Sequence, residues 1–173
     1  MACDIITKGR KLPCKDNRIG IKLVDFAVYD STGFTVADQE ISSLPGWLED
    51  VYRYEVKATG NSLVETSTTD MEKRTVDVKQ VLSLLLQKIT KASEVELLAL
   101  IYSTVVAFVH DYNGNVYAVG IDTGLDASTS TKSTDDGGYK LTLEATDTKF
   151  SPFLSSGAIT ALDALVSANN VEP

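Results

Sequence analysis

The stretch "TVVAFVHDYNGNVYAVGID", residues 104–122, is the clearest structural signal in the chain. Two runs of β-branched and aromatic residues flank Asn113 and Gly114. The Asn-Gly pair favours a two-residue type I′ turn, because both central residues of that turn adopt positive φ. The stretch therefore predicts a β-hairpin, and an antiparallel sheet is the natural setting for it.

Alternation of apolar and polar residues predicts strands on both sides of this hairpin. The expected strands are "IGIKLVDFAVYD" (19–30), with a bulge near Asp25, "VYRYEVKATG" (51–60), a long "RTVDVKQVLSLLLQKI" (74–89) and "YKLTLEATDTKF" (139–150). In the last of these, Tyr139, Leu141, Leu143 and Ala145 share one face. The intervening "STGFTVADQEISSLPGW" (31–47) indicates loops with room for one short strand.

Two short helices are expected. Ser93 followed by Glu96 three residues later forms a capping box, with Thr90 as a competing start. Apolar residues then recur about one turn apart at Val95, Leu98 and Tyr102. Near the C-terminus, a second short amphipathic helix can form through Ile159, Leu162 and Leu165 or Val166.

Two segments are too polar for a core strand. Residues 61–73, "NSLVETSTTDMEK", are interpreted as a long loop or the projecting end of a hairpin, and 124–138, "GLDASTSTKSTDDGG", as a loop. Six or seven strands and one internal helix predict an antiparallel β-sandwich or barrel with a flanking helix. We expect an N-terminal arm over 1–18, this β-domain with its long loop over 19–153, and a C-terminal segment over 154–173.

Composition narrows the class of protein. The chain has 173 residues, 43% of them apolar and 23% charged, which is ordinary for one globular domain. No apolar run reaches the roughly 18 residues of a spanning helix, and the polar start does not resemble a signal peptide, so synthesis in a cytoplasm without a membrane partner is expected. The net charge of -8 argues against attraction to nucleic acid phosphates.

Chemistry-bearing residues are sparse. Cys3 and Cys14 have no CxxC partner or histidine at zinc spacing, so small half-buried residues are favoured over a disulfide or a metal clip. The single histidine, His110, lies near a turn without a GxSxG elbow and is interpreted as an exposed or edge-strand residue. "TDDGG" (134–138) could hold calcium, but a plain turn is favoured. We therefore expect no enzyme, catalytic residue, cofactor or metal.

Charge and polarity do mark candidate contact residues for assembly. The basic arm could dock on an acidic surface of another copy or be a solvated tail, and a long loop in a compact domain commonly binds something. The candidate oligomer contacts are Lys8, Arg10, Lys11, Lys15, Arg18, Asn61, Ser62, Thr66, Thr68, Asp70, Glu72 and Lys73. A carbohydrate-binding sandwich would instead need an aromatic platform, for which Trp47, Tyr52 and Tyr54 are the candidates.

The order of these features resembles the tail-tube fold family of tailed-bacteriophage structural proteins, as found in crAss-like and related phages of Bacteroidetes. The resemblance covers residues 1 to about 153 and rests on "MACDIITKGRKLPCKDNRIGIK" (1–22), "YEVKATGNSLVETSTT" (54–69), "LQKITKASEVELLALIYS" (86–103), "VAFVHDYNGNVYAVGIDTGLDAS" (106–128) and "GGYKLTLEATDTKFSPF" (137–153).

This resemblance implies a virion subunit, a tail-tube or neck-ring protein assembled in the host cytoplasm. Copies would join sheet to sheet in a ring, probably of six, and rings would stack on each other or on other virion proteins through the arm and residues 61–73. That segment is expected to order only between rings, and DNA is expected to pass an acidic lumen without specific binding. The alternative roles are a head–tail completion or capsid-surface protein and, less favoured, a carbohydrate-binding module.

Overall fold

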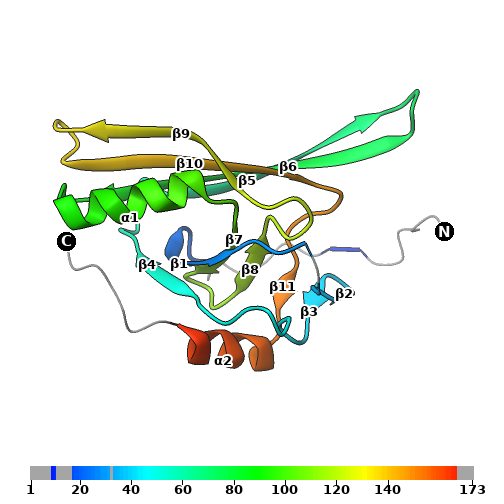
Figure 1. Cartoon of the computed structure of the whole chain (residues 1–173). Coiled ribbons are helices and arrows are strands. Elements are labelled where there is room, and N and C mark those ends of the chain that lie inside the picture. The colour runs from blue at the N-terminus through cyan, green and yellow to red at the C-terminus, as the bar shows by residue number, and fades with distance from the viewer. Residues whose placement is uncertain (1–8, 11–16, 32, 167–173) are drawn as a thin grey trace.

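The computed structural model describes residues 9–10, 17–31 and 33–166. It confirms a mainly β protein with two stacked sheets and flanking helices, which is a sandwich and not a closed barrel (Figure 1). The strands are β1 (Ile21–Val28), β2 (Val36–Ala37), β3 (Glu40–Ile41), β4 (Tyr52–Glu55), β5 (Ser62–Asp70), β6 (Thr75–Gln87), β7 (Val105–Asp111), β8 (Val116–Val119), β9 (Asp126–Ser133), β10 (Gly138–Asp147) and β11 (Phe153–Leu154). The helices are α1 (Lys91–Tyr102) and α2 (Ser156–Leu165).

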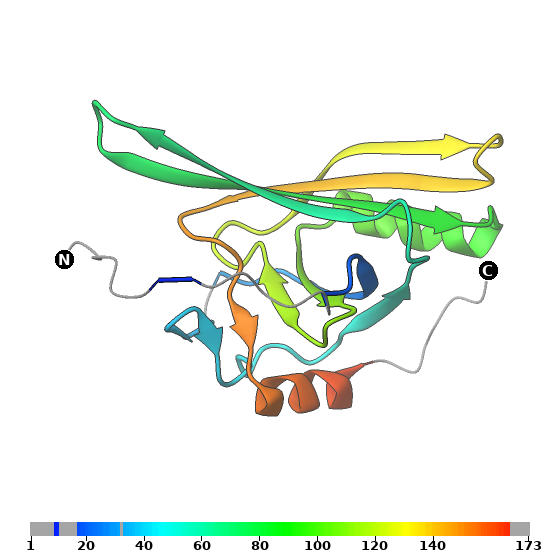
Figure 2. The same ribbon diagram turned by 180° about the vertical axis from the view of Figure 1, so that it is seen from behind.

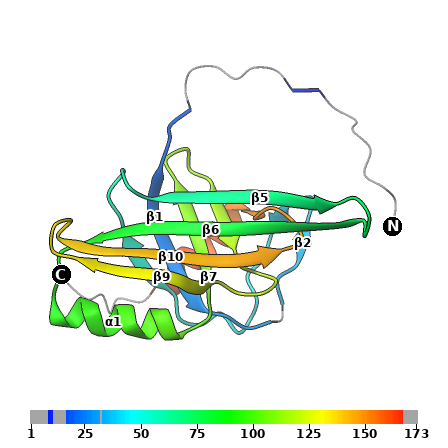
Figure 3. The ribbon, with the colours of Figure 1, turned by 90° about the horizontal axis from the view of Figure 1, so that it is seen from above.

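The strands form a seven-stranded sheet, β2-β3-β11-β8-β7-β1-β4, and a four-stranded sheet, β5-β6-β10-β9. Every pairing is antiparallel except the two-residue pairing of β11 with β3. The long strands of the four-stranded sheet cross steeply over those of the seven-stranded sheet (Figure 3). The helix α2 covers the opposite face of the seven-stranded sheet, so the fold has three layers (Figure 1).

Two apolar clusters hold these layers together. The first lies between the sheets and contains the face of β10 that the sequence predicts, with Tyr139, Leu141, Leu143 and Ala145 all buried. The second lies between the seven-stranded sheet and α2. Leu162 is fully buried there, and Ile159, Leu165 and Val166 pack around the same cluster, as expected for the second helix.

The central hairpin is confirmed as β7 and β8, but the prediction of a type I′ turn is wrong. The backbone N–H of Asp111 donates to the carbonyl of Asn115 at 3.0 Å, which closes a three-residue loop. Gly114 has φ +87, and Asn113 has no positive φ. The carboxylate of Asp111 also accepts from the N–H groups of Asn113 (2.9 Å) and Asn115 (2.8 Å). These local bonds favour a turn followed by a glycine bulge.

The first helix begins one turn earlier than the capping box predicts. Thr90 is the N-cap and accepts from the backbone N–H of Ser93 at 3.1 Å, so the competing start is the correct one. Leu97 and Leu100 point into the core. The stripe of Val95, Leu98 and Tyr102 that indicated the helix is exposed. Helical spacing thus identified the element but not its buried face.

Both segments predicted as loops contain strands. Ser62–Asp70 is β5 and pairs with β6 along its whole length. The prediction of a long loop at 61–73 is therefore wrong, and the alternative of a projecting hairpin is the correct one. Asp126–Ser133 is β9 and pairs with β10. Backbone hydrogen bonds to β6 and β10, whose core-facing side chains are apolar, stabilise β5 and β9. These two strands therefore need few apolar side chains of their own.

The irregularity of β1 lies elsewhere than predicted. The register of β1 against β7 shifts between Ile21 and Leu23, not near Asp25. Asp25 itself is regular and buried.

Candidate assembly surfaces and a buried charged cluster

The two edges of the four-stranded sheet are exposed strands. Within the described ranges, β5 pairs only with β6 and β9 only with β10. Neither strand contains a proline, and each carries two charged residues: Glu65 and Asp70 on β5, and Asp126 and Lys132 on β9. Exposed edges of this kind are templates for pairing with another chain, because their outer N–H and C=O groups are unpaired.

The strands of this sheet are also staggered. β5 pairs with residues 75–83 of β6. β9 pairs with residues 138–144 of β10, and those residues pair in turn with residues 81–87 of β6. β5 therefore extends beyond β9 toward the start of β6, and β9 extends beyond β5 toward the end of β6. A stagger of this kind is what a sheet of inclined strands needs if it is to curve into a barrel.

The outer face of the four-stranded sheet is rich in hydroxyl groups and carries charges of both signs. Val64, Thr66 and Thr68 are exposed on β5, and Leu63 and Glu65, on either side of Val64, are half-buried. No described element lies over the outer face of this sheet (Figure 3). Lys79 and Glu144 form an ion pair of 2.7 Å across neighbouring strands. Acidic and basic side chains therefore occur side by side on this face.

The far part of the β5–β6 hairpin projects beyond the rest of the molecule (Figure 2). At its tip, Met71 is 84% exposed and Val76 is 48% exposed. Asp70 stabilises the tip by accepting from the backbone N–H groups of Glu72 (2.9 Å) and Lys73 (3.0 Å). A two-stranded ribbon without a core of its own is only marginally stable in water, so this projection gains from a partner.

A groove of about 500 Å³ lies beneath the β5 edge, on the core side of the four-stranded sheet. Apolar side chains on β1, β5, β7 and the loop before β11 line it, and two carboxylates lie among them. These lining residues include Ile19, Ile21, Leu63, Val109, Phe150, Glu65 and Asp111. Ile19 is 91% exposed at the rim. The groove is open to solvent and has both apolar and polar side chains in its lining.

The predicted contact residues divide between these surfaces. Lys8, Lys11 and Lys15 lie outside the described residues, and Arg10 is exposed. Arg18 is held at the β7–β8 turn, where its N–H donates to Asn113 and its guanidinium lies over the ring of Tyr112. Asn61 and Ser62 line the groove. Asn61 is largely structural, because its Oδ1 accepts from the N–H of Leu85 at 2.7 Å.

The remaining predicted residues lie along the hairpin. Thr66 and Thr68 are on β5, and Asp70, Glu72 and Lys73 form its tip. The predicted residues that the structure describes therefore do not form one site. Asn61 and Ser62 line the groove, whereas Thr66, Thr68 and the tip residues lie along the hairpin. Neither the exposed stripe of α1 nor the β9 edge was predicted from the sequence as a contact surface, although Val95, Leu98 and Tyr102 recur at helical spacing.

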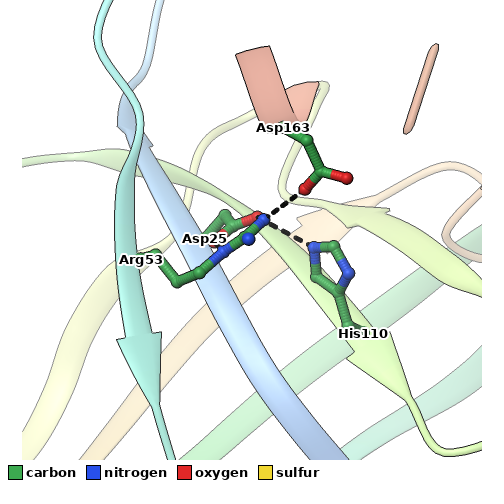
Figure 4. Close-up of polar contacts among 4 residues, drawn as sticks. All are labelled: Asp25, Arg53, His110 and Asp163. Carbon is green, nitrogen blue, oxygen red and sulfur yellow. Dashed lines mark hydrogen bonds and ion pairs between the residues drawn. The ribbon is translucent and has the colours of Figure 1, made fainter. Parts of the chain in front are cut away.

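A buried charged cluster lies on the α2 side of the seven-stranded sheet (Figure 4). Asp25 on β1 is fully buried and lies opposite Arg53 on β4. His110 Nε2 lies 2.8 Å from Asp25 Oδ2, and Arg53 also bonds Asp163 of α2 at 2.6 Å. The cluster thus links three strands to the helix that covers them.

Two opposing effects act on the pKa of Asp25. Burial raises it, whereas hydrogen bonds and attraction from Arg53 and His110 lower it and prevail. The Arg53 pKa is raised by the bond to Asp25. The carboxylate is therefore held ionised and neutralised by its neighbours, which is a structural role.

His110 is partnered by Asp25 within the cluster. His110 is 13% exposed in its side chain and is paired, which differs from the predicted exposed histidine. Neither of the two grooves includes His110, and among the described residues no serine or threonine hydroxyl bonds its ring. Within the described ranges, no group of three or more metal-ligating side chains converges, and "TDDGG" includes the turn between β9 and β10.

A second groove, of about 410 Å³, is lined by two carboxylates, Asp122 and Asp147. Asp147 is buried, and its Oδ2 has no hydrogen-bond partner among the described atoms. Burial and the nearby carboxylate of Asp122 raise its pKa. Backbone N–H groups of Asp122 and Thr123 offset part of this cost.

The aromatic platform required of a carbohydrate-binding module does not form. Trp47 packs edge-on against Phe34 in the α2-side cluster. Tyr54 packs edge-on against Phe26 in the cluster between the sheets. Tyr52 is left as an isolated exposed ring.

Comparison with protein-family models, curated proteins and solved structures finds no match to this chain. A search of the described helices finds none that is long and apolar enough to span a membrane. The functional argument therefore depends on the surfaces themselves.

Proposed function

We propose that the protein is a phage virion subunit, of the tail-tube or neck-ring type, whose copies form rings that enclose a DNA conduit. The observation that carries this proposal is the four-stranded sheet with two exposed, staggered edges. The family resemblance of the sequence agrees with it but is a separate argument.

Strand parity favours joining β9 of one copy to β5 of the next. The sheet has four strands and each is antiparallel to its neighbour, so its two edge strands run in opposite directions. A second copy in the same orientation would therefore place its β9 antiparallel to β5 of the first. The joint continues the alternation without turning any copy over, which is the requirement for a head-to-tail ring.

The outer face of that sheet is the natural wall of the conduit. Hydroxyl groups and neutralised pairs such as Lys79 with Glu144 offer no continuous row of basic groups to hold phosphates. Because sequence-independent DNA binding depends on such groups, DNA would pass without specific contacts. The projecting β5–β6 hairpin is then the element that reaches a neighbouring ring or another tail or neck protein.

The experiment that tests the proposal is sedimentation velocity together with negative-stain electron microscopy of the purified protein over a range of concentrations. Rings or hollow tubes are expected. A monomer at every concentration would overturn the proposal.

An edge-strand variant adds a sharper test. Neighbouring residues direct their N–H groups to opposite sides of a strand, so one of Ser130→Pro and Thr131→Pro removes only an outward N–H from β9. The variant that keeps wild-type thermal unfolding is the informative one, and the other is the control for damage to the sheet. Loss of assembly in the informative variant is expected, and unchanged assembly would exclude β9 as a joint.

A further inference from the structure

We infer that the exposed stripe of α1 packs into the groove beneath β5 of the adjacent copy, so that a helix and a groove seal each joint under the paired strands. This inference rests on the proposed function and names the second contact in the same joint. Its occupant is another copy of this chain.

The stripe is a ready-made contact surface. Val95 (57% exposed), Leu98 and Tyr102 (86% exposed) lie on the side of α1 opposite the buried Leu97 and Leu100. A surface helix normally turns its apolar stripe to the core, and α1 has a second stripe that points outward. Tyr102 adds a hydroxyl donor to an apolar ring, a combination common at interfaces.

The helix and the groove lie on the same side of the four-stranded sheet, under opposite edges. Glu94 of α1 bonds Lys132 of β9 and Tyr139 of β10, and Tyr139 points into the core between the sheets. The groove is lined by Leu63 and Glu65, which face that same side of β5. Figure 3 shows α1 along the flank next to β9, with β5 at the other edge.

The helix runs along the whole of β9. Its first turn bonds Lys132 near the end of that strand, and Thr104, just after its last turn, donates to Asp126 at the start of the strand (2.7 Å). When β9 of one copy pairs with β5 of the next, α1 must therefore lie alongside the core side of β5. The groove lies at that position. A single position of the second copy therefore pairs β9 with β5 and also places α1 against the groove.

The two surfaces are also chemically complementary. The groove offers the exposed apolar side chains of Ile19 and Phe150 beside the half-buried Leu63. The carboxylates of Glu65 and Asp111 also line it and already accept hydrogen bonds within the chain, Glu65 from Ser151 and Asp111 from Tyr117. The stripe offers apolar side chains and the phenol of Tyr102. Burial of both would remove the exposed parts of Ile19, Phe150 and the stripe side chains from water, which favours association.

Charge substitution on the stripe tests the inference. Leu98→Asp and Tyr102→Asp are expected to fold like the wild type, because both side chains are exposed. Each should raise the concentration for half-maximal assembly by roughly tenfold or more, measured by sedimentation. Tyr52→Asp on β4 is the matched control, an exposed ring on the other sheet, and should assemble normally. Normal assembly of both stripe variants, or equal loss in the control, would overturn the inference.

Cross-linking tests the geometry. In a Cys3→Ser, Cys14→Ser background, Leu98→Cys combined with Ile19→Cys should give a ladder of trimers and larger products with a short bismaleimide, because each joint is head-to-tail. Leu98→Cys alone should give no dimer; a dimer would indicate helix-to-helix packing and overturn the inference. If the wild type assembles but no ladder forms, only this inference fails. If the wild type never assembles, the proposed function fails with it.

Discussion

The carboxylate of Asp25 and the guanidinium of Arg53 form a two-pronged ion pair across β1 and β4, with Nε to Oδ1 and Nη2 to Oδ2 both at 2.8 Å. Arg53 then reaches Asp163, so the pair also fixes α2 against the sheet. A planar guanidinium is suited to this role, because a lysine cannot supply both prongs.

Asp25→Asn is expected to lower the free energy of unfolding by about 3 kcal/mol, because Arg53 and His110 would lose their buried anionic partner. Urea denaturation followed by circular dichroism measures this change. Asp163→Asn is the control and should cost less than about 1 kcal/mol, since Asp163 is half exposed. Equal effects in the two variants would contradict a special role for Asp25.

The same pair predicts an acid dependence of stability. Because the folded pKa of Asp25 lies below its ordinary value, its contribution is complete above the unfolded pKa of about 3.9 and is lost as the pH falls through the folded pKa. The difference in unfolding free energy between the wild type and Asp25→Asn should therefore shrink from about pH 6 to about pH 2.5. A difference that stays constant over this range would contradict the assignment.

Asp147→Asn is expected to stabilise the protein at neutral pH. Its folded pKa is raised by burial and by Asp122, so the ionised form is less stable in the folded protein than in the unfolded one. The stability cost appears as the pH rises above the unfolded pKa and is absent below it. The melting temperature should rise by roughly 2–4 °C at pH 7 for each 1 kcal/mol removed. Calorimetry at about pH 3 should show little of this gain.

Gly114→Ala should destabilise the β7–β8 hairpin by about 1 kcal/mol, because φ is +87 at this position and an alanine there is strained even in open space. Gly46→Ala is the matched control, since Gly46 is equally free of neighbours and has no positive φ. It should be neutral or slightly stabilising. Thermal unfolding of both variants separates backbone strain from loss of space.

Shortening the projecting hairpin should affect assembly without affecting folding. Replacing residues 68–77 with Asn-Gly joins Ser67 to Val78, which are paired across β5 and β6, through a favoured two-residue turn. The removed residues bury little, so monomer stability should change by no more than about 1 kcal/mol. Electron microscopy should show rings without long tubes, and tubes of wild-type length would contradict a stacking role.

Sequence alone identified the elements whose side chains make their own core. β10 alternates strongly, and its buried residues follow the predicted face. β7 and β8 were recognised as runs of β-branched and aromatic residues on either side of a turn, and the first five residues of β7 are all buried. Sequence alone missed β9 and left β5 open between a loop and the end of a hairpin, because Ser- and Thr-rich strands gain stability from backbone hydrogen bonds to β10 and β6 that local patterning does not reveal. The helix start at Thr90 was an open alternative, since two capping residues three positions apart compete locally.

The surfaces were harder to predict than the fold. Residues 61–73 were correctly marked as an unusual segment, but their division between groove and projection depends on pairing with β6. The buried pairing of Asp25 with His110 and Arg53 joins residues up to 85 positions apart, so only the register of three strands reveals it. The one feature of the sequence that pointed to this cluster was Asp25, a carboxylate in the middle of an apolar strand.

The difference between the edges β5 and β9 has a consequence for directionality. A joint between unlike edges has no twofold axis, so every copy in a ring would point its hairpin the same way around and along the axis. A stack of such rings would be a polar filament with chemically different ends. Elongation and termination would then require two different partner surfaces, one that accepts the hairpin tips and one that supplies them.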